Sequence, residues 1–212
     1  MDLNFKQVLI LAPHTDDGEF GCGGTINKLL ENNVEVHLAA FSACEKSVPK
    51  QFPEDILIKE LKDATKVLGI PESNVHLFRY DVRLFNVSRQ DILQDLIDLR
   101  EKLSPDVVFL PASTDIHQDH ITIHQEGKRA FKFTSILGYE MPWNNLEFQT
   151  SSFVFLEEKH VEKKIEALKM YKSQLHRPYS NEEFLKSLAR IRGVQINTQY
   201  AEAFEIIRWI IK

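Results

Sequence analysis

Short apolar runs that alternate with helical patterns constrain the fold of this chain more than any other feature of its sequence. The runs have the length and composition of buried strands and lie at residues 8–11, 34–41, 74–78 and 107–110. Between two of them, apolar residues repeat at three and four from Ile56 to Leu68 and stop at Gly69, as in an amphipathic helix. Four such alternations predict a Rossmann-like α/β fold, a doubly wound, mostly parallel sheet flanked by helices.

The remaining segments are predicted in less detail. A first helix is expected to open near Ile26, and a later one to run from about Ile121 to Phe133. For the last third of the chain, the sequence predicts strands at 136–139 and 152–156 and a helix at 158–171. Helix and loop are expected at 177–200, and a closing strand or edge helix at 204–211. No repeat, low-complexity tract or Gly/Ser-rich linker divides the 212 residues, so we expect one domain, 1–212.

Composition excludes several function classes. A net charge of -5 and a pI near 5.9 give no electrostatic basis for binding nucleic acid or an anionic membrane. The segment from Met1 to Lys6 lacks the pattern of a signal peptide, and no apolar run approaches the roughly 20 residues that span a bilayer. Two cysteines, Cys22 and Cys44, are too few for a disulfide framework. We therefore expect a cytoplasmic protein with a small-molecule ligand.

Two polar clusters follow apolar runs in equivalent positions. His14, Asp16 and Asp17 come directly after the run at 8–11, and a second cluster, from Asp115 to His120, follows the run at 107–110. Open α/β sheets bind ligands beyond the carboxyl ends of their strands. If both strands are parallel and central, the two clusters meet at one edge of the sheet, where they predict a metal-dependent hydrolase site.

The residue types of the two clusters fit a catalytic metal. His14, Asp17 and His120 together supply two imidazoles and one carboxylate, which leaves the fourth position of a tetrahedral zinc open. These ligands sum to one negative charge, so the ion keeps positive charge and lowers the pKa of its water to roughly 7.

Hydrolysis also needs groups that move protons. Asp16, next to a candidate ligand in the same turn, is placed to act as the base. His117, three residues before His120, suits a donor to the oxyanion and the leaving group. Asp119 is a candidate to hydrogen-bond a ring nitrogen and fix its tautomer.

The residues of the two clusters also have simpler, non-functional interpretations. A histidine at a strand end is commonly solvated, and an aspartate in a turn commonly forms an Asx-turn, but two such clusters in the same topological position favour function. The stretch Gly21-Cys22-Gly23-Gly24 faintly resembles a dinucleotide-binding turn, yet the third glycine of that fingerprint falls at Ile26. Cys22 has no neighbouring thiol and is expected to pack rather than to bind metal.

The two clusters resemble the motifs of the LmbE-like, or PIG-L, family of zinc-dependent N-deacetylases. The family motif Ala-His-Pro-Asp-Asp-Glu stands here as Pro13-His14-Thr15-Asp16-Asp17-Gly18, and His-x-Asp-His as His117-Gln118-Asp119-His120. Thr15 and Gly18 depart from the family pattern, which bears on loop shape more than on chemistry. The likeness continues to Ser173-Gln174 and to the segment 201–204, so it spans nearly the whole chain.

The resemblance implies roles for particular residues. It implies zinc held by His14, Asp17 and His120, Asp16 as general base, and His117, oriented by Asp119, stabilising the tetrahedral intermediate. It further implies removal of an acetyl group from an N-acetylglucosamine-type sugar or conjugate, with the loop residues Asp81 and Arg83 contacting that sugar.

The sequence leaves two alternative functions open. Two histidines and one carboxylate also form the facial triad of a non-haem Fe(II) oxygenase, and Fe(II) can replace zinc at this ligand set. A non-catalytic metal- or sugar-binding module of the same fold is the second alternative. The sugar, the pathway and the oligomeric state, which is compatible with a homo-oligomer, are not defined by the sequence.

Overall fold

The strand β1 (Gln7–His14) lies inside a seven-stranded sheet with the order β3-β2-β1-β4-β5-β7-β6. The computed structural model describes residues 5–211; residues 1–4, in the segment where a signal peptide was sought, lie outside the described part. Neighbours are parallel from β3 to β5, whereas β7 pairs antiparallel with both β5 and β6. The other strands are β2 (Glu35–Ser42), β3 (Val75–Leu77), β4 (Val107–Pro111), β5 (Ser135–Tyr139), β6 (Ser152–Leu156) and β7 (Tyr200–Arg208).

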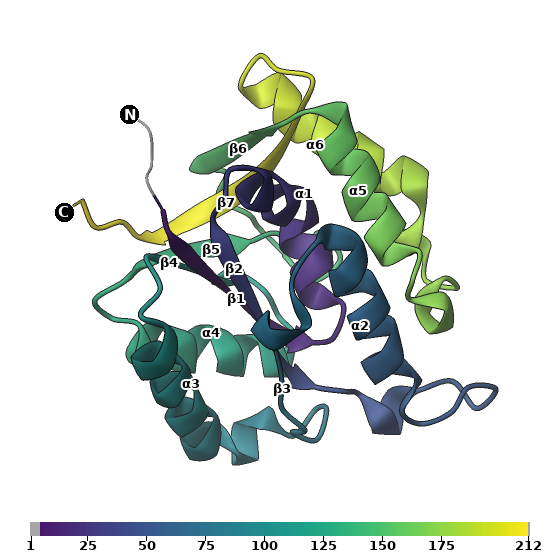
Figure 1. Cartoon of the computed structure of the whole chain (residues 1–212), viewed down its shortest axis with the longest axis vertical. Coiled ribbons are helices and arrows are strands. Elements are labelled where there is room, and N and C mark those ends of the chain that lie inside the picture. Colours follow the sequence, from purple (N-terminus) through teal and green to yellow (C-terminus); the bar gives the residue numbers. More distant parts are fainter. Residues whose placement is uncertain (1–4, 212) are drawn as a thin grey trace.

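Helices cover both faces of this sheet, which confirms the doubly wound α/β fold (Figure 1). The helices are α1 (Asp17–Glu31), α2 (Ile56–Leu68), α3 (Arg89–Leu103), α4 (Gln118–Ala130), α5 (Glu158–Leu168) and α6 (Glu182–Gln195). Side chains alternate along β1: Val8 and Ile10 belong to the core beneath α1, α2, α5 and α6, and Leu9 and Leu11 to the core beneath α3 and α4. Within residues 5–211, none of the helices is long and apolar enough to cross a membrane.

One sequence prediction needs correction. Helix α1 begins at Asp17 rather than near Ile26, so the glycines at 21, 23 and 24 lie inside the helix. Glycine disfavours a helix interior, and tertiary packing overrides that propensity here. The closing segment is a strand, one of the two alternatives predicted, and this strand, β7, lies between β5 and β6.

Gly21 permits a close approach between α1 and β5. A Cβ atom at this position would lie 2.4 Å from a ring carbon of Tyr139, closer than real contacts allow. The Tyr139 ring is fully buried, and its hydroxyl donates to the Leu11 carbonyl at 2.9 Å. The missing side chain thus lets α1 pack directly onto the residue that supports the end of β1.

Glu202 joins the last strand to the first helix. Its carboxylate, on β7, accepts the backbone N–H groups of Gly24 at 3.1 Å and Thr25 at 2.7 Å in α1. Lys164 of α5 donates to the same carboxylate at 2.7 Å, and the side chains of Lys164 and Glu202 are both 8% exposed. A buried carboxylate requires such partners, and these three fix α1 against the carboxyl-terminal half of the chain.

Candidate active site

The two polar clusters lie side by side because their strands do. Strand β1 pairs parallel with β4, with Val8 opposite Val107. The chain winds from β1 through β2 to β3 on one side and continues from β4 to β5 on the other, so the loops after β1 and β4 flank the topological switch point. The expectation that the clusters meet at one edge of the sheet is confirmed.

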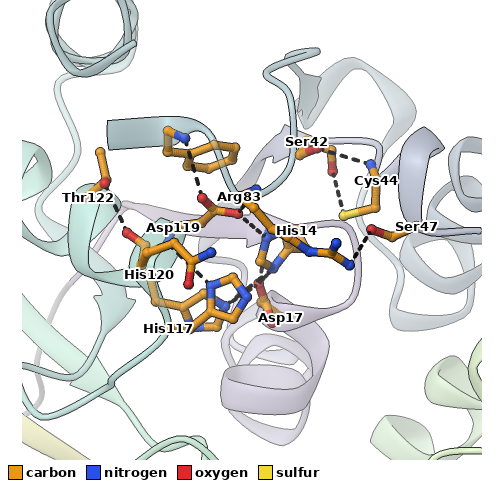
Figure 2. A network of polar contacts seen from close by, with 12 residues as sticks. His14, Asp17, Ser42, Cys44, Ser47, Arg83, His117, Asp119, His120 and Thr122 are labelled. Atoms are coloured by element: carbon orange, nitrogen blue, oxygen red, sulfur yellow. Dashed lines mark hydrogen bonds and ion pairs between the residues drawn. The ribbon is translucent and has the colours of Figure 1, made fainter. Parts of the chain in front are cut away.

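Three atoms form a small triangle where β1 ends and where α1 and α4 begin (Figure 2). Asp17 Oδ2 lies 3.0 Å from His14 Nδ1 and 3.1 Å from His120 Nε2, and the two nitrogens are 3.3 Å apart. In a tetrahedral zinc site with bonds of about 2.0–2.1 Å, ligand atoms are about 3.3–3.4 Å apart. The triangle therefore has nearly the size of one face of such a tetrahedron.

An outer carboxylate contacts the second nitrogen of each of these rings. Asp119 Oδ2 is 3.0 Å from His14 Nε2, and Asp115 Oδ2 is 2.7 Å from His120 Nδ1. A neutral imidazole carries one N–H, and when it donates this to the outer carboxylate, its inner nitrogen presents a lone pair toward Asp17. Two lone pairs and a carboxylate oxygen facing one another attract a cation, so these residues fit a divalent metal.

The pKa values of His14, His120 and Asp17 reflect the charges that surround them. Burial lowers the pKa of His14, but Asp17 and Asp119 outweigh burial and raise it to about 9. At His120, Asp17 and Asp115 likewise outweigh burial and raise the pKa to about 10. Burial raises the pKa of Asp17, whereas the two imidazoles hold it well below its usual range. The protein's own charges thus hold positive charge at this point, as a cation site requires.

His117 lies next to the triangle but is held differently. Its Nδ1 accepts the backbone N–H of Asp119 at 3.2 Å, and its ring centroid is 4.9 Å from that of His14 and 4.7 Å from that of His120. Burial, then the charges of His120 and His14, lower its pKa to about 4. A neutral ring that accepts at Nδ1 carries its hydrogen on Nε2. His117 can nonetheless offer a ligand atom within 4.8 Å of those of the other two histidines.

Asp119 contacts a ring nitrogen through its carboxylate, as the sequence predicted, and the ring is that of His14. The resemblance implied that Asp119 orients His117, and only its main-chain N–H contacts that ring. The Asp119 carboxylate also accepts the backbone N–H groups of Arg83 at 2.7 Å and Phe85 at 3.4 Å.

Asp16 occupies the N-cap position of α1, yet its side chain makes no capping hydrogen bond. The carboxylate is half-buried and lines the cavity that contains the triangle. Burial, then the charge of Asp17, raises its pKa to about 6. A carboxylate that is held near the triangle without a capping bond remains available to exchange a proton.

The cavity above the triangle has a volume of about 340 Å³, at the small end of ligand sites. Of the two residues predicted to contact substrate, Arg83 lines the cavity, in a backbone conformation with φ of 70°. Asp81 is not among the lining residues; it forms an exposed ion pair with Lys46 at 2.7 Å. The structure therefore brings Arg83 to the cavity and leaves Asp81 outside it.

Several residues of the site were not predicted. Asp115 stands in the second cluster, but its spacing from His120 did not reveal that it contacts that ring. Other lining residues come from irregular segments that carry no periodic pattern: Trp143, Asn144, Gln174, Arg177 and Tyr179. The Trp143 and Tyr179 rings stack at 3.9 Å, and Phe20 meets both edge-on, which gives the cavity one aromatic wall.

Fold and site together define an α/β protein with a candidate metal centre at the switch point of its sheet. The model of the family PIG-L, described as GlcNAc-PI de-N-acetylase, matches residues 9–131, more than half of the chain. The chain belongs to the PIG-L family. The "Uncharacterized deacetylase YaiS" of Escherichia coli K12 is 28% identical over 174 residues, which cover 79% of this chain and 91% of the relative.

Solved structures show the same fold. N,N'-diacetylchitobiose deacetylase from Pyrococcus horikoshii superposes with a TM-score of 0.77 at 22% identity, covering 96% of this chain and 84% of that one. GalB, a 4-carboxy-2-hydroxymuconate hydratase from Pseudomonas putida KT2440, also gives 0.77, at 19% identity and 98% of both chains. Because a deacetylase and a hydratase share this fold, the fold alone does not define the reaction.

Proposed function

We propose that residues 1–212 form one metal-dependent N-deacetylase domain that removes the acetyl group from an N-acetylated amino sugar or sugar conjugate. The observation that carries the proposal is the triangle of His14, Asp17 and His120, with Asp16 and His117 beside it in one cavity. Membership of the PIG-L family and the deacetylases among its relatives support the same reaction class.

The triangle would hold zinc, or Fe(II), through two imidazoles and one carboxylate. Bound there, such an ion acidifies a water molecule and polarises the acyl oxygen of the amide. We prefer this ligand set to one that contains His117, because His14 and His120 already lie within 3.3 Å of each other and both contact Asp17.

The side chains of the cavity then move the protons. Asp16 takes the proton of the attacking water and returns one to the leaving amine. His117 donates a hydrogen bond from Nε2 to the acyl oxygen as negative charge develops there. Asp119 and Asp115 keep the rings of His14 and His120 in the tautomers that direct their lone pairs inward.

The cavity wall fits a sugar. Phe20, Trp143 and Tyr179 supply apolar surface, and Tyr179 adds a hydroxyl. Arg83 offers hydrogen-bond donors on the same cavity, whereas Asp81, paired with Lys46, is not among the lining residues and is proposed to contact only parts of a substrate that extend beyond the cavity. A small-molecule N-acetyl sugar is thus the proposed partner.

The rival functions have less support. An Fe(II) oxygenase has no need of a carboxylate such as Asp16, held beside the ligands without a capping bond. A non-catalytic module would have no need of the combination of Asp16 and His117 around the triangle.

The decisive experiment measures acetate released from a panel of N-acetyl sugars by protein stripped of metal and reloaded with zinc or Fe(II). We expect acetate release that a chelator abolishes and added metal restores. His14→Ala and His120→Ala should lose the ion while the fold persists. Full metal occupancy in both variants, or oxygen consumption in place of acetate release, would overturn the proposal.

A further inference from the structure

We infer that Arg177 binds a negatively charged group of the substrate. The inference rests on the proposed function and specifies its substrate class: an N-acetyl sugar that carries an anionic substituent, a phosphate or a carboxylate. Arg177 is half-buried, lines the same cavity as the triangle, and lies just after the short 3-10 helix Lys172–Gln174.

The side chain of Arg177 is held in place by a buried chain of hydrogen bonds. Arg177 Nε donates to Gln174 Oε1 at 2.6 Å, and Gln174 Nε2 donates to Ser173 Oγ at 3.0 Å. Ser173 in turn donates its hydroxyl and its backbone N–H to Glu60 of α2, at 2.6 and 2.9 Å. Glu60, Ser173 and Gln174 are all at most 5% exposed.

This chain also fixes the orientation of the Gln174 amide. A flipped amide would place two donors against the Arg177 N–H and would leave the Ser173 hydroxyl oxygen without a donor. The guanidinium is therefore anchored at Nε, and its terminal Nη groups, beside the Tyr179 side chain, form no ion pair with a carboxylate in the part of the chain that the structure describes. Such preorganised bidentate donors match the geometry of a carboxylate or a phosphate.

The charge of Arg177 has no carboxylate partner within the described part of the chain. No ion pair joins it to an acidic residue within residues 5–211; it contacts the neutral Gln174 and the Tyr179 ring, whose centroid is 5.8 Å from Arg177 Cζ. Burial raises the pKa of Asp16 on the same cavity, and the charge of Arg177 acts on that pKa in the opposite direction. Arg83, on the same cavity, likewise has a hydroxyl neighbour, Ser47 Oγ, at 3.3 Å, rather than a carboxylate. Other arginines of the fold, such as Arg89 and Arg192, are paired with glutamates.

The two guanidiniums on the cavity offer a place for an anion. Arg83 and Arg177 line it together with Asp16 and Asp17, and Asp115 and Asp119 contact the rings of the triangle. These four carboxylates would surround a divalent cation at the triangle, whereas neither guanidinium forms an ion pair with any of them within the described residues. A guanidinium that faces a cavity without an ion-pair partner favours a substrate that brings negative charge.

The test is equilibrium binding to metal-loaded Asp16→Asn protein, in which turnover is suppressed. The probes are N-acetylglucosamine, its 1-phosphate, its 6-phosphate, and N-acetylmuramic acid, which carries a carboxylate. We expect at least one anionic probe to bind roughly ten- to a hundredfold more tightly than the neutral sugar, the range of a charged hydrogen bond. The best probe distinguishes a phosphate site from a carboxylate site.

Adding Arg177→Gln should abolish most of that preference while leaving affinity for the neutral sugar in place. Arg208→Gln, an exposed arginine on β7, is the matched control and should change nothing. If Arg177→Gln does not fold, Gln174→Glu places a carboxylate against Arg177 and should suppress anion binding in the same way.

Equal affinity for neutral and anionic probes, or a preference that survives both changes, overturns the inference. Equal losses for all four probes would assign Arg177 a purely structural role and would overturn it too. The proposed function fails separately, if metal-loaded wild-type protein releases no acetate from any N-acetyl sugar.

Discussion

Asp119 Oδ2 lies 3.0 Å from His14 Nε2, at the ring nitrogen that Asp17 does not contact. The two residues are 105 positions apart: His14 ends β1, and Asp119 lies in the first turn of α4. The same carboxylate accepts backbone N–H groups from Arg83 and Phe85, so it joins the loop after β3 to a candidate metal ligand. A carboxylate in this position fixes the ring and makes its inner nitrogen a stronger ligand.

Asp119→Asn should therefore weaken metal binding by roughly 10- to 100-fold while the fold is retained, the range observed for such outer carboxylates. Competition with a chelator of known affinity measures the change. Asp98→Asn, an exposed aspartate on α3, is the control and should bind metal as the wild type does. Wild-type affinity in Asp119→Asn would show that its carboxylate does not support the ligand.

The variant His117→Ala tests whether His117 donates a hydrogen bond to the substrate or binds the metal ion. If His117 stabilises the developing charge, the variant should keep one ion per chain and lose roughly 10²-fold or more in kcat. Elemental analysis and acetate release check both parts. Loss of the ion would place His117 among the ligands, which its ring nitrogen, within 4.8 Å of the others, is close enough to be.

Asp16→Asn nearly preserves shape while removing basicity. We expect retained metal, near-native thermal stability and a kcat for amide hydrolysis lower by roughly 10²–10⁴-fold, the range of general-base catalysis. Deacetylation at the wild-type rate would contradict the proton-transfer role. Loss of the metal would move Asp16 into the ligand set.

Gly21→Ala tests the close packing of α1 on Tyr139. Helix propensity alone favours alanine by roughly 1 kcal/mol. The new Cβ would lie 2.4 Å from a fully buried ring that is anchored through its hydroxyl to Leu11, so the ring has little freedom to move. Overpacking should outweigh propensity and lower the free energy of unfolding by roughly 1–3 kcal/mol, as measured by urea denaturation. A variant as stable as the wild type would contradict this packing.

His76 should make the protein less stable in mild acid. Its ring stacks on that of His37 at 5.4 Å, and burial, then Lys102 and His37, lower its pKa to about 4 from the ordinary 6.5. Between these values the unfolded chain binds the proton and the folded one does not, so stability falls as pH falls through this window. The melting temperature of His76→Gln should depend less on pH there. Exposed His176→Gln is the control, and equal slopes would refute the prediction.

The parts of the fold that depend on local pattern were predictable from the sequence. The strands β1 to β4 and the helices α2 and α3 carry clear apolar periodicity, and Gly69 ends α2 in the left-handed conformation expected of a helix terminus. The sequence placed the start of α1 too late, because glycines lower helix propensity. In the structure these glycines allow close packing of the helix. The place of β7 inside the sheet depends on which edges are free in three dimensions, which periodicity does not encode.

The candidate site likewise has parts that were predictable from the sequence and parts that depend on the tertiary structure. Pairing two polar clusters required only the rule that parallel strands present their carboxyl ends together. The contacts of Asp115 with His120 and of Asp119 with His14 depend on side-chain direction in the turn, and spacing along the chain does not define it. Arg177 follows a 3-10 turn without periodicity, so only the tertiary structure brings it to the cavity.

The position of β7 sets the order in which a nascent chain can complete this site. Strand β6 pairs with β7, and β7 also covers β5, so both strands present open edges until residues 200–208 have left the ribosome. The same segment delivers Glu202 to the backbone of α1, the helix that begins with Asp17. The turn that contains His14 and Asp17 is therefore synthesised first and fixed in place last. A chain that stalls before Tyr200 would expose two unpaired strand edges and would lack the Glu202 contacts that hold α1.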